Sequence, residues 1–150
     1  MLTTSPQADI LLVEDSPDDV ELTLRSLKKN NVTNRVAVVQ DGAEALEYLF
    51  ATDRYAHLVD CTLPKVVLLD LKLPLVSGIE VLRRCKADKR TSQIPIVVLT
   101  SSREEPDIHT CYGLGVNSYI VKPVDFQQFT EAVRQVGLYW LLLNETPTAS

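Results

Sequence analysis

The sequence predicts an α/β fold, a doubly wound parallel sheet, from two observations. Five short apolar runs alternate along the 150-residue chain with segments in which apolar residues recur at helical spacing. The runs are continuously apolar, which indicates strands that helices bury on both faces. Right-handed crossovers and the length of one ordinary domain then favour an open sheet of five strands with the order 2-1-3-4-5.

The first strand and helix are predicted within residues 10–29. Residues 10–13 form the first apolar run. Ser16 and Pro17 are typical of a helix N-cap and of the first helical position. Asp19 lies three residues after Ser16, in the pattern of a capping box. The helix is therefore expected to begin at Pro17.

The next two units follow the same pattern. Residues 36–39 are the second predicted strand, and Asp41 is the expected cap of the helix that follows. Residues 51–64 are expected to be a loop of about fourteen residues, which is long for a compact domain and therefore a candidate contact surface. The third strand is predicted at 66–69, and Ser-Gly at 77–78 marks the turn before the third helix.

The last two units begin with predicted strands at 94–99 and 119–121. Ser102 is the expected cap of the fourth helix, and Gly113 is its expected end. The fifth helix is expected to open at Asp125. The prediction is thus five alternating strands and helices.

Composition excludes several classes of protein. The formal charge of -5 argues against direct nucleic-acid binding, which usually needs a basic face. No apolar run approaches the ~18 residues of a membrane span, and the polar start has no signal-peptide pattern. Cys61, Cys85 and Cys111 lack metal-ligand spacing and are expected to be reduced thiols. We therefore expect a cytoplasmic protein with neither a membrane nor a nucleic acid as direct partner.

Chemically functional side chains follow four of the predicted strands. Glu14 and Asp15 follow the first strand, Asp70 the third, Thr100 ends the fourth and Lys122 follows the fifth. The carboxyl ends of parallel strands meet at one edge of the sheet, and ligands bind there, between strands 1 and 3. A charge directly after a buried strand is costly unless it is paired. These residues are therefore predicted to form one site.

The residue types at this site point to phosphoryl transfer. Clustered carboxylates repel one another, and oxygen-only ligands beside an open cleft suit Mg²⁺ or Mn²⁺. Ionised Asp70 can attack phosphorus directly and form an acyl phosphate. Lys122 supplies a fixed positive charge and Thr100 a hydroxyl donor for the phosphoryl oxygens. Each residue alone is more often structural, so the hypothesis depends on their conjunction.

Four motifs together resemble the receiver domain of two-component response regulators: "ILLVEDSPDD", "VVLLDLKLPLVSG", "IPIVVLTSS" and "YIVKP". The resemblance implies a flavodoxin-like fold in which Asp70 accepts phosphate from a histidine kinase, as a phosphoacceptor rather than an enzyme. It covers about residues 8–137 of a single domain spanning 1–150, and it leaves a C-terminal helix extension and tail at 138–150.

The resemblance also implies a metal site. Asp15, Asp70 and the backbone carbonyl of Lys72 would ligate Mg²⁺, and Glu14 would act through a metal-bound water. Lys72 departs from the family, which usually has asparagine or a similar polar residue there. A lysine beside the metal is expected to alter metal affinity or the lifetime of the phosphoryl group.

The family's switching residues have counterparts in this chain. By resemblance, Thr100 and Lys122 engage the phosphoryl oxygens. Tyr119 is the switching aromatic, which turns inward behind Thr100 and reshapes the surface of the fourth helix, fifth strand and fifth helix. The Lys122–Pro123 peptide bond is expected to be cis, as is typical of the family.

Segment 51–64 and the ending "VGLYWLLLNETP" resemble single-domain regulators that pair with bacterial and cyanobacterial phytochromes. The resemblance implies a phytochrome-type sensor histidine kinase as partner and a symmetric homodimer. Apolar residues cover the whole circumference of the terminal helix, so we expect a dimer interface at Tyr139, Trp140, Leu141 and Leu142. The alternative is a tail folded back on its own domain. No output domain is expected, so the signal would pass through protein contacts.

Three other classes of protein are alternatives. A phosphatase of the haloacid dehalogenase type also has an aspartate after a strand, but it needs a second aspartate where Lys72 stands. A flavodoxin-like binding protein needs a phosphate-binding loop after the first strand, and "EDSPDD" is too acidic for that without a metal. A receiver-like module that binds partners without phosphorylation would not need the four site positions that are present here.

Overall fold

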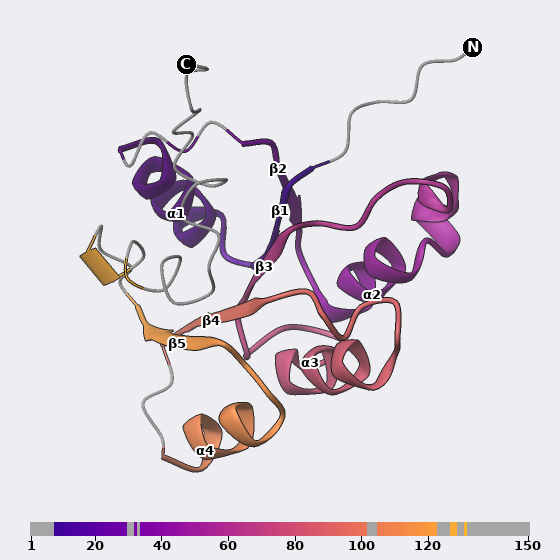
Figure 1. The fold of residues 1–150 in the computed structure, drawn as a ribbon. Helices are drawn as coiled ribbons and strands as arrows, with labels where there is room; N and C mark the ends of the chain where they lie inside the picture. Colours follow the sequence, from indigo (N-terminus) through magenta and orange to yellow (C-terminus); the bar gives the residue numbers. More distant parts are fainter. Residues whose placement is uncertain are drawn as a thin grey trace, which may run out of the picture.

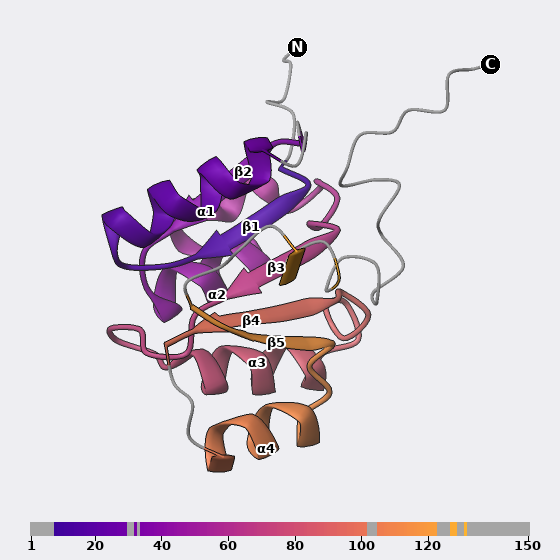
Figure 2. The same ribbon diagram turned by 90° about the vertical axis from the view of Figure 1, so that its left-hand side faces the viewer.

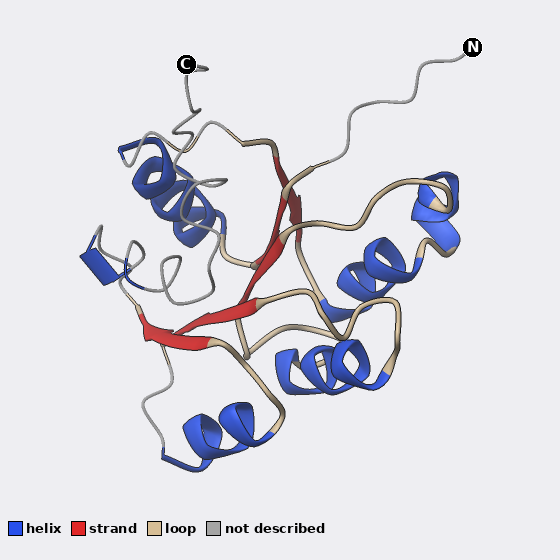
Figure 3. Cartoon of the chain, in the orientation of Figure 1, coloured by secondary structure: helices blue, strands red, loops and turns tan. Residues whose placement is uncertain are grey.

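The structure is a computed structural model that describes residues 8–29, 32, 34–101, 105–122, 127–128 and 131. Five parallel strands form one sheet in the order β2-β1-β3-β4-β5, which confirms the predicted fold class (Figures 1 and 3). The strands are β1 (Ile10–Val13), β2 (Val36–Val39), β3 (Val66–Leu69), β4 (Ile96–Thr100) and β5 (Ser118–Val121).

Helices cover both faces of the sheet. They are α1 (Pro17–Lys29), α2 (Gly42–Phe50), α3 (Gly78–Ala87) and α4 (Glu105–Gly113), with a 3-10 helix, η1 (Asp53–Leu58), after α2. The two views show α1 on one face and α2 and α3 on the other (Figures 1 and 2). Among these described helices, none is long and apolar enough to cross a bilayer. The predicted fifth helix is described only at 127–128 and 131, which are helical.

Side chains of the central strands alternate between the two faces of the sheet, and both faces are covered. This explains why the sequences of these strands are continuously apolar. In β3, Val67 and Leu69 join the core beneath α2, α3 and α4, while Val66 and Leu68 join the core beneath α1. All four side chains are 0% exposed. Because successive strand side chains point to opposite faces, a strand covered on both sides has no polar position.

Two predicted helix caps are present. The Asp41 carboxylate accepts a hydrogen bond from the Glu44 N–H at 2.7 Å, and Ser16 Oγ accepts one from the Asp19 N–H at 3.3 Å. The capping box predicted at Ser16 is wrong in its second half. The Ser16 N–H donates to Glu14 Oε2 at 3.2 Å, because the Asp19 carboxylate points toward another group, described below.

The loop prediction for residues 51–64 is wrong in part, because the segment contains η1. Tyr55 in η1 donates its hydroxyl to Glu44 Oε2 at 2.5 Å and packs edge-on against Tyr48 with ring centroids 5.0 Å apart. These contacts with α2 cross a turn between two elements, so the periodicity within one strand or helix does not reveal them. The segment is therefore a structured extension of α2.

The predicted start of β4 is also wrong by two residues. The strand begins at Ile96, not at residue 94. The Ile94 N–H closes a turn on the Thr91 carbonyl at 3.0 Å, and its carbonyl accepts from Lys86 Nζ at 3.2 Å. Pro95 has no N–H to donate to a neighbouring strand. Apolar character alone cannot distinguish such a turn from the strand that follows it.

Two glycines bring the loop after β3 against its neighbours. A Cβ on Gly78 would lie 2.2 Å from the Asp70 carbonyl oxygen, and one on Gly42 would lie 1.8 Å from the Val76 carbonyl oxygen. The Gly78 N–H donates to the Leu71 carbonyl at 2.8 Å. Only a residue without a side chain allows these approaches. The loop after β3 is therefore packed against the start of α3 at Asp70 and against the start of α2 at Val76.

We expect Gly42→Ala to lower the free energy of unfolding by about 1–3 kcal/mol, because the added methyl group must displace backbone atoms of the loop after β3. Chemical denaturation measures this loss. Gly113→Ala is the matched control, because a Cβ there meets nothing within 4 Å. Equal stability of the two variants would contradict the proposed role of Gly42.

Candidate functional site

Backbone hydrogen bonds align the carboxyl ends of the strands. The Asp70 N–H donates to the Val13 carbonyl at 3.1 Å, and the Glu14 N–H donates to the Val39 carbonyl at 3.0 Å. On the other side of the sheet centre, the Lys122 N–H donates to the Thr100 carbonyl at 2.8 Å. These bonds continue the strand ladders by one residue. They therefore bring the residues that follow four strands to one edge.

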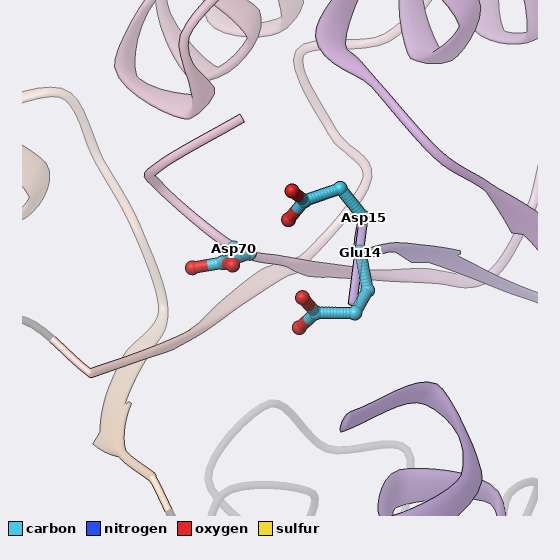
Figure 4. Close-up of side chains that lie close together, drawn as sticks. All are labelled: Glu14, Asp15 and Asp70. Carbon is cyan, nitrogen blue, oxygen red and sulfur yellow. The ribbon is translucent and has the colours of Figure 1, made fainter. Parts of the chain in front are cut away.

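Three carboxylates gather at this edge. Oxygen atoms of Glu14, Asp15 and Asp70 all lie within 4.8 Å of one another, and Figure 4 shows the side chains of Glu14 and Asp15 extending toward the side where Asp70 lies. Glu14 and Asp70 are 2% and 7% exposed, whereas Asp15 is exposed. Oxygen-only donors with one open side fit a hard divalent cation such as Mg²⁺ or Mn²⁺.

Burial makes Glu14 a weak acid for a carboxyl group. Desolvation raises its pKa from 4.5 to about 6; the charge of Asp70 acts in the same direction, and Lys122 acts against both. In the metal-free protein the folded state therefore binds this proton more tightly than the unfolded chain does. The contribution of Glu14 to the free energy of unfolding falls as the pH rises from 4.5 to about 6.

Lys122 lies at the centre of the carboxylates. Its Nζ donates to Glu14 Oε1 at 2.5 Å, to Asp19 Oδ2 at 2.9 Å and to Asp70 Oδ2 at 3.4 Å. The lysine side chain is 13% exposed. Burial lowers the pKa of the Lys122 ammonium, but the surrounding carboxylates outweigh this effect and raise it above its usual value. Lys122 is therefore a fixed positive charge at neutral pH.

Both oxygens of Asp70 have partners. Oδ1 accepts a hydrogen bond from the Leu71 N–H at 2.7 Å, and Oδ2 faces the Lys122 ammonium. Thr100 is fully buried at the end of β4. Tyr119 in β5 is half-buried and packs against the core beneath α2, α3 and α4, opposite Val98 of β4. A chain of contacts thus runs from the carboxylates along β4 and β5.

The structure brings together most of the predicted site. Glu14, Asp15, Asp70 and Lys122 meet at the sheet edge, and the Thr100 backbone joins them through Lys122. Lys72 is exposed on the loop after β3. Four predictions lie outside the described residues: the helix cap at Ser102, the helix start at Asp125, the cis bond before Pro123 and the interface at 139–142.

Asp19 is not among the site residues that the sequence predicts. The helix-start pattern predicts a capping residue there, yet its carboxylate forms an ion pair with Lys122, 103 positions along the chain. The acidic motif "EDSPDD" was the available signal, because its carboxylates exceed what a helix start needs. Only the folded sheet, in which the Lys122 ammonium after β5 meets the carboxylates that follow β1, reveals the partner.

Comparison with known proteins agrees with this geometry. The response regulator receiver domain family matches residues 10–134, and the chain belongs to that family. It is 39% identical to the probable methanogenesis regulatory protein FilR2 of Methanothrix harundinacea, over 92% of this chain and 86% of the relative. It is 34% identical to response regulator Rcp1 of Synechocystis, over 97% of each chain.

Solved structures extend the comparison. The bacteriophytochrome response regulator AtBRR is 52% identical, covers 93% of this chain and 100% of its own, and superposes with a TM-score of 0.81. The Mn²⁺-bound form of Rcp1 is 34% identical, covers 95% of this chain and 98% of its own, and has a TM-score of 0.74. The chain is thus a receiver-domain response regulator related to phytochrome response regulators.

We expect millimolar Mg²⁺ or Mn²⁺ to raise the thermal midpoint of the protein, because a ligand that binds only the folded state stabilises it. Asp15→Asn should lose most of this shift, since Asp15 is an exposed member of the acidic trio. Differential scanning fluorimetry, with and without chelator, measures the shift. Asp18→Asn removes a neighbouring carboxylate from outside the trio and should keep it. The same shift in both variants would contradict the assignment of Asp15.

Proposed function

We propose that this protein is a response regulator in which Asp70 accepts a phosphoryl group from a sensor histidine kinase. The observation that carries the proposal is the position of the Asp70 carboxylate. It is nearly buried, 3.4 Å from a lysine ammonium and within reach of two further carboxylates that can share a divalent cation. Membership of the receiver family supports the same role.

The chemistry follows from these groups. An oxygen of Asp70 attacks the phosphorus of a phosphohistidine, the P–N bond breaks, and the imidazole leaves with the electron pair and takes up a proton. The products are an acyl phosphate on Asp70 and the unphosphorylated histidine side chain of the kinase. Lys122 and the Thr100 hydroxyl donate to the phosphoryl oxygens, where negative charge is concentrated. No separate base is needed, because the Asp70 carboxylate attacks in its ionised form.

We also propose that a divalent cation binds beside Asp70. Asp15, Asp70 and the Lys72 carbonyl would hold Mg²⁺ or Mn²⁺, with Glu14 acting through a bound water. The cation would offset the charge of the phosphoryl oxygens. The acidic trio supports this assignment, and so does the relative Rcp1, whose structure is described as a Mn²⁺-bound form. We also propose that the exposed Lys72 side chain alters the lifetime of the phosphoryl group on Asp70.

The proposed partner is a phytochrome-type sensor kinase in the cytoplasm. Similarity to Rcp1 and to a bacteriophytochrome response regulator supports this choice. Phosphorylation would draw Thr100 toward the phosphoryl group and let Tyr119 turn inward. That movement would change a protein-binding surface on α4, β5 and the fifth helix. We also propose that the chain is a single receiver domain and that two copies form a homodimer through residues 139–142.

Incubation with a small phosphodonor and Mg²⁺ should add one phosphate to the protein. Asp70→Asn should abolish the addition, because the variant has no carboxylate to act as nucleophile. Intact mass spectrometry measures the adduct, and chelator should prevent it. Asp60→Asn, at an exposed aspartate after η1, controls for the loss of one carboxylate. Labelling of Asp70→Asn, or no labelling of the parent protein, would refute the proposal.

A phosphoryl mimic such as beryllofluoride should change the ring environment of Tyr119, because Thr100 moves away from it. Aromatic NMR of tyrosine-labelled protein measures the change, with assignment by Tyr119→Phe. Thr100→Ala should reduce the shift. Tyr48, which packs on Tyr55 beside α2, is the internal reference. An unchanged Tyr119 signal in the presence of bound mimic would exclude this coupling.

A further inference from the structure

Asp19 occupies a helix start but does not act only as a helix-start residue. Its N–H is already capped by Ser16 Oγ at 3.3 Å. Its side chain leaves the helix end and accepts a hydrogen bond from Lys122 Nζ at 2.9 Å. Asp18 lies beside it in the same first turn and is exposed, as a carboxylate stabilised only by the helix dipole would be.

The contact between Asp19 and Lys122 matters because the lysine ammonium has a limited number of hydrogen-bond donors. An ammonium has three N–H donors, and here three carboxylates accept them. The closest is Glu14 at 2.5 Å, then Asp19 at 2.9 Å, and the farthest is Asp70 at 3.4 Å. Glu14 and Asp19 therefore hold the ammonium more closely than Asp70 does. The third N–H is directed at the proposed phosphoacceptor without a short ion pair to it.

We propose that Asp19 is a positioning residue that holds the Lys122 ammonium back from Asp70. This inference rests on the proposed function of Asp70 as phosphoacceptor. Held in this way, Lys122 makes only a long contact of 3.4 Å with Asp70 Oδ2, so this oxygen keeps more of its charge for attack on phosphorus. The ammonium remains close enough to contact an arriving phosphoryl oxygen. Without the Asp19 charge, the lysine would close on Asp70 and neutralise the nucleophile.

Asp19 is well placed for a test. Of the three carboxylates that contact Lys122, Glu14 and Asp70 also belong to the acidic trio, whereas Asp19 does not. The Asp19 side chain is 37% exposed, and the largely buried Lys122 keeps Glu14 and Asp70 as partners when Asp19 is replaced. The replacement therefore leaves no buried polar group without a partner. A change at Asp19 therefore alters the position of the lysine while the trio stays intact.

The experiment compares Asp19→Asn, Asp19→Glu and Asp18→Asn with the parent protein. The rate constant of phosphorylation by a small phosphodonor is measured by intact mass at saturating Mg²⁺, and Mg²⁺ affinity is titrated separately. We expect Asp19→Asn to slow phosphorylation by about 3- to 10-fold, as suits a partly exposed ion pair. Asp19→Glu should restore the rate, and Asp18→Asn should stay within about twofold of the parent protein.

Each result has a definite meaning. A parent protein that is not phosphorylated refutes the proposed function itself. If the parent protein is labelled but both Asn variants react at its rate, the positioning role of Asp19 is wrong while the role of Asp70 stands. Equal slowing in Asp18→Asn and Asp19→Asn assigns the effect to helix-end charge and also overturns the inference. Slowing in Asp19→Asn that Asp19→Glu does not restore overturns it as well, and thermal midpoints identify any variant that fails to fold.

Discussion

One ammonium group at the carboxyl edge of the sheet balances several carboxylates, and the arrangement of the site depends on that balance. Lys122 contacts Glu14, Asp19 and Asp70, while Asp15 completes the acidic trio. Glu14 and Asp70 are almost entirely buried, so their charges cannot be screened by water. The raised pKa of Glu14 reflects this burial first and the nearby Asp70 charge second, and Lys122 offsets them only in part. A phosphoryl group would add more negative charge at the same point, which explains why a divalent cation belongs in the proposal.

The fold places this local charge balance at the ends of two paired strands. Thr100 and Lys122 end β4 and β5, and a backbone hydrogen bond of 2.8 Å joins them. Tyr119 lies on β5 three residues before Lys122, opposite Val98 of β4. Movement of the lysine or the threonine therefore acts on two paired strands rather than on a loose loop. On the other side, Gly78 packs against the Asp70 carbonyl so closely that the acceptor end of β3 is held in place.

Two surface features of this chain lie beside the site and beside α2. Lys72 stands on the loop after Asp70, and the 3-10 helix η1 extends α2 through the Tyr55–Glu44 hydrogen bond. Both features leave the order of the strands unchanged. Both lie on segments outside the strands, where proteins of one fold commonly differ.

The strand order, the burial of the strands on both faces and the grouping of Glu14, Asp15, Asp70 and Lys122 follow from the sequence alone. They do so because strand periodicity is local and because parallel strands must end at one edge. The tertiary structure alone decided the ion pair of Asp19 with Lys122, the turn at Ile94 and the helix within residues 51–64. Each depends on a partner distant in sequence or on a single hydrogen bond. Local pattern specifies where a side chain stands on its element, but only the packed fold specifies which group it meets.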